Sequence, residues 1–292
     1  MEEGIIVKAL SGFYYVENEK GVYQCRGRGL FRKQKIKPLV GDKVRFEAEQ
    51  KEEGYIYEIA ERHNELNRPP VANIDQAFVV FSAEEPAFSA LLLDRFLVHM
   101  EALDIKAVIV VNKMDLADEK RKQELFSFQQ DYEKIGYQFY FVSGKNGNGI
   151  EELPPLLGGA VSIVAGQSGV GKSTLLNSLD PALKLETAEI SSHLGRGKHT
   201  TRHVELLPMH NGWVADTPGF SSLEFQFVDE EDLDVCFPEM KERLPNCKFR
   251  GCTHRREPGC AVKDALENGD IPSYRYEHYI LFYKEISEQR RY

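Results

Sequence analysis

Short apolar-rich runs alternate with polar turns along the first 66 residues. These runs cover residues 4–10, 13–17, 22–28, 43–48 and 55–60. Glycines and clusters of Asn, Glu and Lys separate them at intervals of about 8 to 12 residues, which is typical of a small all-β barrel or sandwich. The pattern predicts an OB-like or SH3-like barrel, and five short strands favour the OB-fold.

The hydrophobic rhythm changes after residue 74. Just before it, Arg68, Pro69 and Pro70 indicate a linker, because two prolines stiffen the chain and block both a helix and a strand ladder. Beyond it, apolar runs alternate with longer amphipathic stretches, as in β/α units around a mostly parallel sheet. The apolar runs are 77–81, 107–111, 138–142 and 161–165, and the amphipathic stretches are 91–103, 119–134 and 172–179.

A third change follows at about Asp229, where the pattern becomes helical and rich in loops, with Cys, His and Arg close together. The chain is therefore predicted to be a multidomain α/β protein. The expected domains are a β-barrel over residues 1–66, an α/β domain over 71–226 and a helical domain over 227–292.

Composition sets limits on function. Among 292 residues, 46 are Asp or Glu and 37 are Lys or Arg, so the formal net charge is −9. This excludes a protein that coats RNA or anionic membrane through bulk charge. No run approaches the roughly 20 apolar residues of a membrane span, and acids stand where a signal peptide would carry bases. We therefore expect a cytoplasmic monomer with no membrane partner. Five cysteines are an odd number, so we expect no disulfide framework.

A glycine-rich loop follows the run 161–165. Residues 166–173 fit the phosphate-loop pattern G-x-x-x-x-G-K-[ST] between a strand and a helix. Its backbone N–H groups bind phosphate oxygens, Lys172 neutralises their charge and also serves catalysis, and Ser173 binds Mg²⁺. The alternative is a plain glycine turn before a helix. The expected nucleotide contacts are Gly166, Gln167, Ser168, Gly169, Val170, Gly171, Lys172, Ser173 and Thr174.

Two segments at strand ends point to guanine. Asn112-Lys113-Met114-Asp115 follows the run 107–111. The Asp115 carboxylate can accept from the ring N–H and the exocyclic amine of guanine, whereas adenine would present an acceptor to it. Alone, this segment could equally be a surface turn. Ser143-Gly144-Lys145 can offer backbone N–H groups to the guanine carbonyl. The expected base contacts are Asn112, Lys113, Asp115, Ser143, Gly144 and Lys145.

The magnesium side of the site is expected at Asp216, which follows the predicted strand 212–215. This carboxylate can hold a magnesium-bound water, and the N–H of Gly219 can meet the γ-phosphate. The glycine-rich polar stretch 195–201 suits a mobile switch. One of Thr200 and Thr201, with Thr201 favoured, is expected to complete magnesium coordination and to serve catalysis.

Three cysteines and a histidine lie in one short segment near the C-terminus. Cys247, Cys252, His254 and Cys260 offer the ligand set of a structural Zn²⁺ site. Four protein ligands leave no open position for water or substrate, so we expect one structural ion rather than a zinc catalyst. The alternative is a set of free buried cysteines.

Together these motifs resemble a translation-factor-type GTPase in an unusual order, with the guanine segments before the phosphate loop and Asp216 after it. With the barrel before and the Cys/His cluster after, the chain resembles the circularly permuted, small-ribosomal-subunit-dependent GTPases of the RsgA (YjeQ/YloQ) family. The resemblance implies an OB-fold RNA-binding domain, a permuted GTPase domain and a zinc-binding domain. It also implies GTP/GDP as ligand, the small subunit and its rRNA as partner, and subunit-stimulated hydrolysis of GTP late in subunit maturation.

Phe220 stands where many GTPases have the glutamine that orients the attacking water. A phenyl ring cannot do so by hydrogen bonding, so intrinsic turnover is expected to be slow. His199 is the candidate for this catalytic role, since a neutral imidazole can position or polarise water; the alternative is a solvated loop histidine. Because the segment after Asp216 runs on into the C-terminal domain, hydrolysis is expected to reposition that domain.

Local charge departs from the average. Residues 26–45 hold eight basic residues and one acid, a net charge of +7, and Phe31 among them is expected to stack on a base. Smaller basic groups lie on the expected switch and on the segment of the expected zinc ligands, residues 247–260, which is called the zinc segment below. Any one of them can be a solvated face, but three on separate modules predict a structured RNA surface.

Three functions follow from these observations. The leading hypothesis is a GTP hydrolase that docks on the small ribosomal subunit through both flanking domains. The second is an rRNA-binding checkpoint or chaperone that uses GTP only as a conformational signal. The third, a phosphate-loop kinase for a small metabolite, is disfavoured because only guanine recognition explains residues 112–115 beside the other elements.

Overall fold

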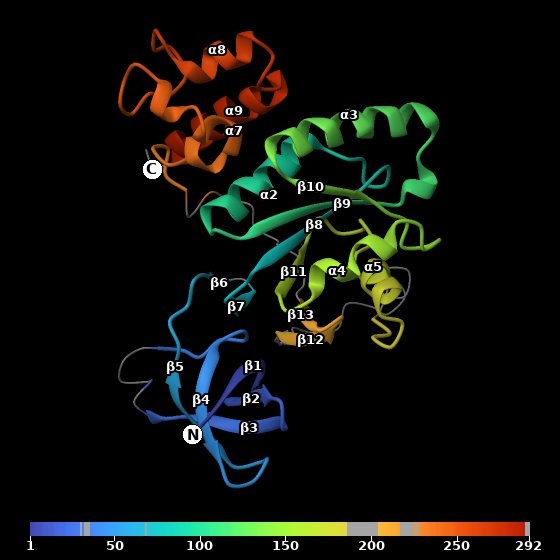
Figure 1. Cartoon of the computed structure of the whole chain (residues 1–292), viewed down its shortest axis with the longest axis vertical. Helices are drawn as coiled ribbons and strands as arrows, with labels where there is room; N and C mark the ends of the chain where they lie inside the picture. The colour runs from blue at the N-terminus through green and yellow to red at the C-terminus, as the bar shows by residue number, and fades with distance from the viewer. Residues whose placement is uncertain are drawn as a thin grey trace.

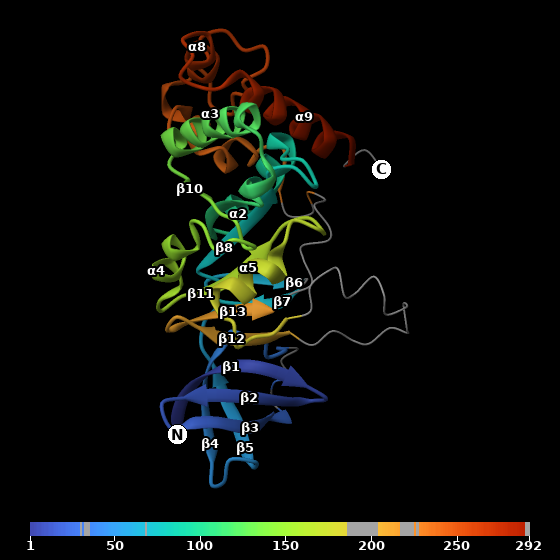
Figure 2. The same ribbon diagram turned by 90° about the vertical axis from the view of Figure 1, so that its right-hand side faces the viewer.

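The computed structural model arranges the chain as three parts along one long axis (Figure 1). It describes residues 1–29, 31, 36–67, 69–185, 204–216, 225 and 228–289. The barrel lies at one end, the central sheet with its helices in the middle, and the C-terminal helices at the other end, an order that Figure 2 shows from the side. Within these ranges, no helix is long and apolar enough to cross a membrane.

Five strands close the N-terminal barrel in the order β1-β2-β3-β5-β4, with β4 paired back to β1 and β3 parallel to β5. Fully buried side chains such as Ile6, Val16 and Phe46 fill its interior. The predicted OB-like barrel is therefore confirmed. The strands are β1 (Glu2–Leu10), β2 (Phe13–Asn18), β3 (Gly21–Gly27), β4 (Lys43–Ala48) and β5 (Gly54–Ile59).

The prediction that the prolines near residue 70 block a strand ladder is wrong, because Pro70 begins a strand of a short hairpin. Strands β6 (Glu65–Asn67) and β7 (Pro70–Ala72) pair antiparallel, with Asn67 opposite Pro70. Proline lacks an N–H donor but is tolerated as the first residue of an edge strand. The hairpin also contacts the barrel through a bridge between Val71 and Val40.

A mostly parallel sheet forms the middle of the molecule, as predicted. Its order is β10-β9-β8-β11-β13, and β12 is antiparallel at the side of β13. Successive residues of β8 face opposite sides, so Val79 and Phe81 pack in one core and Phe78 and Val80 in another. The strands are β8 (Gln76–Ser82), β9 (Lys106–Asn112), β10 (Gln138–Phe141), β11 (Val161–Ala165), β12 (Glu205–Met209) and β13 (Gly212–Asp216).

Helices cover both faces of this sheet (Figure 1). On one face lie α2 (Ala90–Ala102) and α3 (Glu119–Ile135), and on the other α4 (Pro154–Leu157) and α5 (Lys172–Leu179). Short 3-10 turns, η1 (Met114–Leu116) and η2 (Ile150–Glu152), connect strands to helices. Since the parallel strands end on the same side, their following loops gather at one edge of the sheet.

The barrel and the central sheet are joined edge to edge. β1 pairs antiparallel with β12 at Lys8 and Glu205, whose side chains also form an ion pair of 2.8 Å. The result is one eleven-stranded sheet that runs through both parts. The sequence pattern did not predict β12, the strand that makes this connection.

The C-terminal part forms its own small core, in which Phe237, Tyr279 and Phe282 are buried together with Val98 of α2. A buried ion cluster adds to this joint: Arg275 binds both Glu239 of its own domain and Asp94 of α2. The elements are η3 (Asp234–Cys236), α7 (Pro238–Lys241), η4 (Leu244–Asn246), α8 (Ala261–Glu267) and α9 (Ser273–Gln289). The C-terminal domain is thus packed on the α2 face of the central domain.

Candidate nucleotide site and metal centre

The phosphate loop connects β11 to α5 at the gathered edge of the sheet. A Cβ on Gly166 would lie 2.2 Å from the Val80 carbonyl oxygen, and one on Gly171 would lie 2.5 Å from Asn112 Nδ2. Both glycines also have positive φ, at 141° and 92°. Neighbouring strands therefore press on the loop so closely that only glycine fits, which explains two positions of the sequence motif.

Lys172 begins α5 and folds over this loop. Its Nζ donates to the carbonyl oxygens of Gly166 at 2.9 Å and Gln167 at 2.7 Å. Burial lowers the pKa of Lys172, because the charged ammonium is partly removed from water. The cation is therefore held at the loop, where phosphate charge would stabilise it. Ser173 and Thr174 follow in the first turn of α5 and are half-buried.

The buried side chain of Asn112 joins three loops. Its Nδ2 donates to the Val170 carbonyl of the phosphate loop at 3.0 Å, and its Oδ1 accepts from Gly144 N–H at 2.9 Å. Asn112 is 1% exposed and ends β9. One amide thus holds the phosphate loop and both expected guanine segments in a fixed arrangement, which two separate sequence motifs could not reveal.

Asp115 lies beside Ser143 on the guanine side. Ser143 Oγ donates to Asp115 Oδ1 at 2.6 Å, and Ser143 itself is buried while Asp115 is exposed. The hydroxyl orients the carboxylate, and both carboxylate oxygens keep lone pairs that can accept from a ligand. Lys145 is exposed at the edge of the same loop.

Gly144 stands in a narrow space between the guanine segments and α5. A Cβ there would lie 3.3 Å from Leu175 N. Ser178 Oγ of α5 donates to the Gly144 carbonyl at 2.5 Å. The loop is therefore fixed to the helix that follows the phosphate loop, and Ser178 is a supporting residue that sequence reasoning missed.

Asp216 ends β13, which is parallel to β11 with Ala215 opposite Ile163. This register brings the backbone of Asp216 to the strand that leads into the phosphate loop. The expected residues His199, Thr200, Thr201, Gly219 and Phe220 lie outside the described residues, so their roles stay predictions.

Phe225 is the next described residue after Asp216 and packs between α2 and α9. Its ring stacks on His99 of α2 at 5.4 Å and lies 5.0 Å from the ring of Phe282 of α9. The guanidinium of Arg95 lies 4.6 Å above the same ring. The chain that leaves the expected magnesium site is thus anchored in the joint between the central and C-terminal domains.

The four expected metal ligands come together. The ligand atoms of Cys247, Cys252, His254 and Cys260 all lie within 4.8 Å of one another. His254 Nδ1 is 3.2 Å from Cys260 Sγ and 3.7 Å from Cys247 Sγ. This spacing fits a tetrahedral Zn²⁺ site with bonds of about 2.0 to 2.3 Å and no open position. Burial raises the pKa of the Cys252 thiol to about 12, so a bound cation is needed to keep it as thiolate.

Asp234 supports this cluster from behind. Its Oδ2 lies 3.2 Å from His254 Nε2, on the ring side opposite the thiols. A carboxylate there holds the Nε2 proton and leaves the Nδ1 lone pair for a metal. Tyr276 OH donates to the His254 carbonyl at 2.7 Å and Tyr279 OH to the Thr253 carbonyl at 3.0 Å. Sequence reasoning missed these residues, because supporting contacts follow no fixed spacing.

The barrel carries an exposed aromatic surface, but not at Phe31. That ring is only 6% exposed and fills the barrel core, so the prediction that it stacks on a base is wrong. Tyr55, by contrast, is 50% exposed beside a hollow of about 830 Å³. Arg26 stacks on Phe13 at 4.8 Å in the same hollow. The other charged residues that line it are the acids Glu2, Glu47, Glu49, Glu52 and Glu53.

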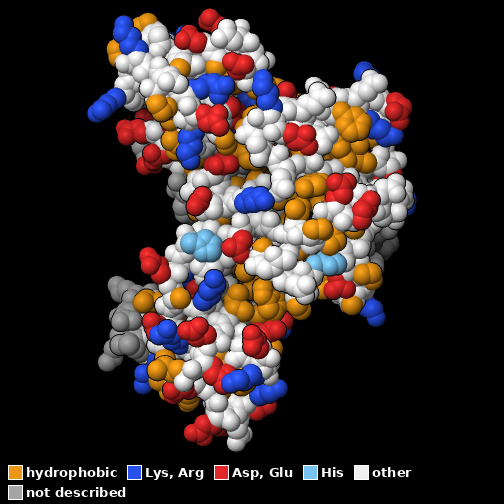
Figure 3. Space-filling view, in the orientation of Figure 1, with side chains coloured by type: hydrophobic (Ala, Val, Ile, Leu, Met, Phe, Trp, Pro, Cys, Tyr) orange, Lys and Arg blue, Asp and Glu red, His pale blue; other side chains and the backbone are white. Residues whose placement is uncertain are grey.

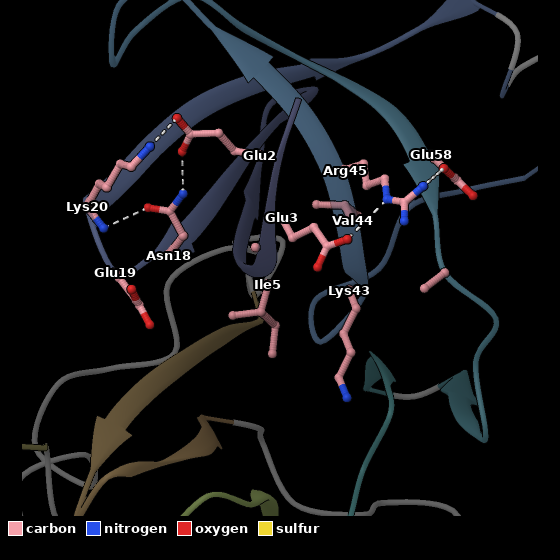
Figure 4. Close-up of a pocket in the computed structure, with 12 residues that line it drawn as sticks. Glu2, Glu3, Ile5, Asn18, Glu19, Lys20, Lys43, Val44, Arg45 and Glu58 are labelled. Atoms are coloured by element: carbon pink, nitrogen blue, oxygen red, sulfur yellow. Dashed lines mark hydrogen bonds and ion pairs between the residues drawn. The ribbon is translucent and has the colours of Figure 1, made fainter.

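A second hollow on the barrel, of about 750 Å³, carries no comparable surface (Figure 4). Most of its charged side chains pair with one another, as in the pairs of Lys20 with Glu2 and of Arg45 with Glu3 and Glu58. The hollow lies on the barrel, away from the phosphate loop. It is therefore not part of the nucleotide site.

Basic side chains of the zinc segment are exposed at the far end of the molecule. Lys248, Arg250 and Arg256 are exposed, as is Phe249 at 45%. Arg255 stacks on Tyr283 at 4.0 Å. Figure 3 shows Lys and Arg mixed with Asp and Glu over the visible face rather than one basic field. Binding of an anionic partner must therefore depend on local patches.

Comparison with protein families gives two matches along the chain. The model of the RsgA GTPase matches residues 59–226, and the model of the RsgA N-terminal domain matches residues 3–56. Whole-chain relatives carry the name small ribosomal subunit biogenesis GTPase RsgA. The one from Halalkalibacterium halodurans is 59% identical over 291 residues, and the one from Bacillus cytotoxicus is 60% identical over 290 residues. The alignments cover 100% and 99% of this chain, and 99% of each relative.

Two solved structures share the fold. YloQ, described as a circularly permuted GTPase, is 49% identical and superposes with a TM-score of 0.87 over 99% of this chain and 96% of its own. YjeQ from Thermotoga maritima is 38% identical, with a TM-score of 0.87 over 97% of this chain and 98% of its own. The similarity therefore includes the order of the motifs as well as the three parts.

Proposed function

The chain belongs to the RsgA GTPase family, a family of GTP hydrolases, and we propose that it hydrolyses GTP on the small ribosomal subunit during late subunit maturation. The relatives' name supports the partner. The observation that carries the chemistry is the side chain of Asn112, which joins the phosphate loop to the segment of Asp115 and Ser143. This joint places a carboxylate that recognises guanine beside a loop that binds phosphate.

For the base, we assign Asp115 to the two guanine N–H donors and the 143–145 segment to the guanine carbonyl. The short bond from Ser143 supports this, because it orients the carboxylate before a nucleotide arrives. Lys113 and Asn112 complete the base contacts. Lys145 is assigned to the exposed edge of the same subsite.

For the phosphates, we assign backbone N–H groups of residues 166–174 and the ammonium of Lys172. The first turn of α5 supplies Ser173 for Mg²⁺, with Thr201 as its second protein ligand and Asp216 for a magnesium-bound water. Gly219 is assigned to the γ-phosphate. We propose His199 as the group that positions the attacking water, with slow turnover in the absence of the subunit. His199→Ala is expected to abolish subunit-stimulated hydrolysis while GTP binding persists.

For the metal centre, we propose one structural Zn²⁺ on Cys247, Cys252, His254 and Cys260. The donor set and the carboxylate behind His254 support a site of this class. The ion would add to the hydrogen bonds that hold this loop, such as Lys248 N–H to the Gly259 carbonyl and Thr253 Oγ1 to Glu257. Its role is to fix the basic segment for docking rather than to take part in hydrolysis.

For the partner, we propose that rRNA binds both ends of the molecule. Tyr55 and the stacked Arg26 offer a platform for unpaired bases on the barrel, and the zinc segment offers Lys248, Arg250 and Arg256 for phosphates. This matches a division into an RNA-binding domain over 1–66, a permuted GTPase domain over 71–226 and a zinc-binding domain over 227–292. We further propose that the protein acts as a cytoplasmic monomer.

The test is GTP hydrolysis with and without purified small ribosomal subunits. Stimulated turnover that Lys172→Ala abolishes supports the proposal, and Lys106→Ala, an exposed residue at the opposite end of β9 from Asn112, should leave it unchanged. GTP-dependent binding without stimulation would indicate the checkpoint or chaperone instead. Preference for ATP with a soluble acceptor would indicate a kinase.

A further inference from the structure

The loop between β8 and α2, residues 83–88, lies against both nucleotide-binding loops. Lys113 Nζ donates to the Glu85 carbonyl oxygen at 2.6 Å. Pro86 Cδ is 3.8 Å from the position that a Cβ on Gly169 would occupy, so it lies beside the phosphate loop. Ala83 N–H donates to the Asn112 carbonyl at 2.9 Å. The loop is therefore a third neighbour of the nucleotide site, although no sequence motif marks it.

The hydrogen bond to Glu85 extends the side chain of Lys113 between two loops. Its Cε lies 3.8 Å from the position that a Cβ on Gly171 would occupy, and its Nζ ends on the 83–88 loop. The four-carbon stem thus spans from the guanine segment past the phosphate loop. A nucleotide base can pack on the apolar stem of a lysine held in this way, and the side chain is already ordered before the base binds. A free lysine would lose rotamer freedom on binding.

Arg121 of α3 holds the loop at both ends. Its Nε donates to the Ala83 carbonyl at 2.9 Å and its Nη2 to the Phe88 carbonyl at 3.4 Å. The side chain is 15% exposed. A planar guanidinium can span two carbonyls in this way, whereas a lysine offers a single point of contact. The residues between these two anchors include Glu85, the partner of Lys113.

We propose that Arg121 is a positioning residue for the guanine nucleotide. It fixes the 83–88 loop so that the Glu85 carbonyl keeps Lys113 extended for the base. The proposal rests on the proposed function, since it takes Lys113 as a base contact. Arg121 acts through the loop and not on the phosphates, so its loss weakens binding rather than the chemical step.

The first test compares nucleotide binding of three variants with a fluorescent GDP analogue. Arg121→Met removes the donors and keeps an unbranched stem, and it is expected to raise the Kd about 3- to 10-fold, through faster dissociation. Arg121→Lys should fall in between. The KM for GTP should rise while kcat changes by less than about 2-fold. Lys120→Met is the matched control, because Lys120 is an exposed residue of the same helix and should not change the Kd.

The second test separates positioning from general support of the fold. Once Lys113→Met has removed the ammonium that bonds to Glu85, adding Arg121→Met should weaken binding by less than about 2-fold more. Full additivity of the two losses would overturn the proposal, as would an unchanged Kd in Arg121→Met. An unchanged Kd in Lys113→Met alone would overturn the base contact itself, which belongs to the proposed function. If Arg121→Met does not fold, the same cycle with Arg121→Lys decides.

Discussion

Arg275 of α9 donates to Asp94 of α2 across 2.5 Å, and neither side chain is more than 1% exposed. The same carboxylate accepts from Tyr132 OH at 2.6 Å. Glu239 receives two further hydrogen bonds from the guanidinium, at 2.7 and 2.8 Å. The C-terminal domain is therefore docked through buried charge. A nucleotide-dependent movement of that domain must carry α2 with it or break this cluster.

Removing this cation should strongly destabilise the protein. Arg275→Met leaves Glu239 buried without a positive partner and leaves Asp94 with His278 as its only basic neighbour among the described contacts, and the free energy of unfolding is expected to fall by about 3–5 kcal/mol. Urea unfolding followed by circular dichroism measures it. The matched control is Lys284→Met on the same helix, whose exposed pair with Glu288 is worth about 0.5 kcal/mol or less. Equal effects of the two variants would contradict the role given to the buried cluster.

Asp234→Asn should weaken zinc binding without removing a ligand. An amide in place of the carboxylate holds the His254 proton less firmly, and loss of such a partner typically lowers metal affinity about 10- to 100-fold. Competition with a chromophoric chelator measures the affinity. Asp232→Asn, an exposed neighbour, is the control and should bind zinc as the unaltered protein does. Unaltered affinity in Asp234→Asn would show that the carboxylate does not orient the ligand.

Glu101 should make stability fall as pH rises. Burial raises the pKa of this carboxyl, although the hydrogen bond from Tyr137 OH at 2.9 Å opposes the shift. The folded state then holds the proton to a higher pH than the unfolded state, so the contribution is present below the unfolded pKa and lost as pH rises through the folded pKa. Glu101→Gln lacks this titration.

The check on Glu101 is urea unfolding of both proteins between about pH 4 and about pH 8. The stability of Glu101→Gln relative to the unaltered protein should increase over this range. A difference that stays constant with pH would exclude a shifted carboxyl. A difference that decreases with pH would mean that the pKa shift has the opposite sign.

Asp115→Asn should change which base is bound. The amide offers a donor where guanine also offers one, so the affinity for GTP is expected to fall about 10- to 100-fold. Xanthosine triphosphate has a carbonyl in place of the exocyclic amine and should bind the variant better than GTP does. Competition against a fluorescent nucleotide measures both. Asp118→Asn, three residues along and at the N-cap of α3, is the control and should keep the preference for GTP.

Tyr55→Ala should weaken RNA binding selectively. Stacking of one base on an aromatic ring is worth about 1–3 kcal/mol, so binding to the small subunit is expected to fall about 5- to 150-fold, with GTP affinity unchanged. Tyr55→Phe keeps the ring and should bind as the unaltered protein does. Subunit binding measured by co-sedimentation tests this. Normal binding of Tyr55→Ala would remove the barrel face from the RNA surface.

Some parts of this molecule follow from short stretches of sequence. The helix Lys172–Leu179 and the parallel strands around it were predicted, because alternation of apolar runs and amphipathic stretches is a local property. The metal cluster was also predicted, since its four ligands lie within 14 residues of one another. The hairpin that contains Pro70 was not predicted, because a proline at the start of an edge strand has the same sequence pattern as a proline in a linker.

Sequence alone determined the chemistry that contiguous residues carry. Phosphate, guanine and metal binding were each predicted from a motif whose residues lie close together in one loop. These are Gly166, Gly171 and Lys172 for phosphate, Asp115 for guanine and the Cys/His cluster for metal. Tertiary structure decided what links these loops. Asn112 to Gly144, Asp234 to His254, Arg121 to the 83–88 loop and Arg275 to Asp94 are contacts between residues that lie 20 to 181 positions apart in the chain and carry no shared pattern. Only folding brings such donors and acceptors within hydrogen-bond distance, and burial then makes each bond costly to lose.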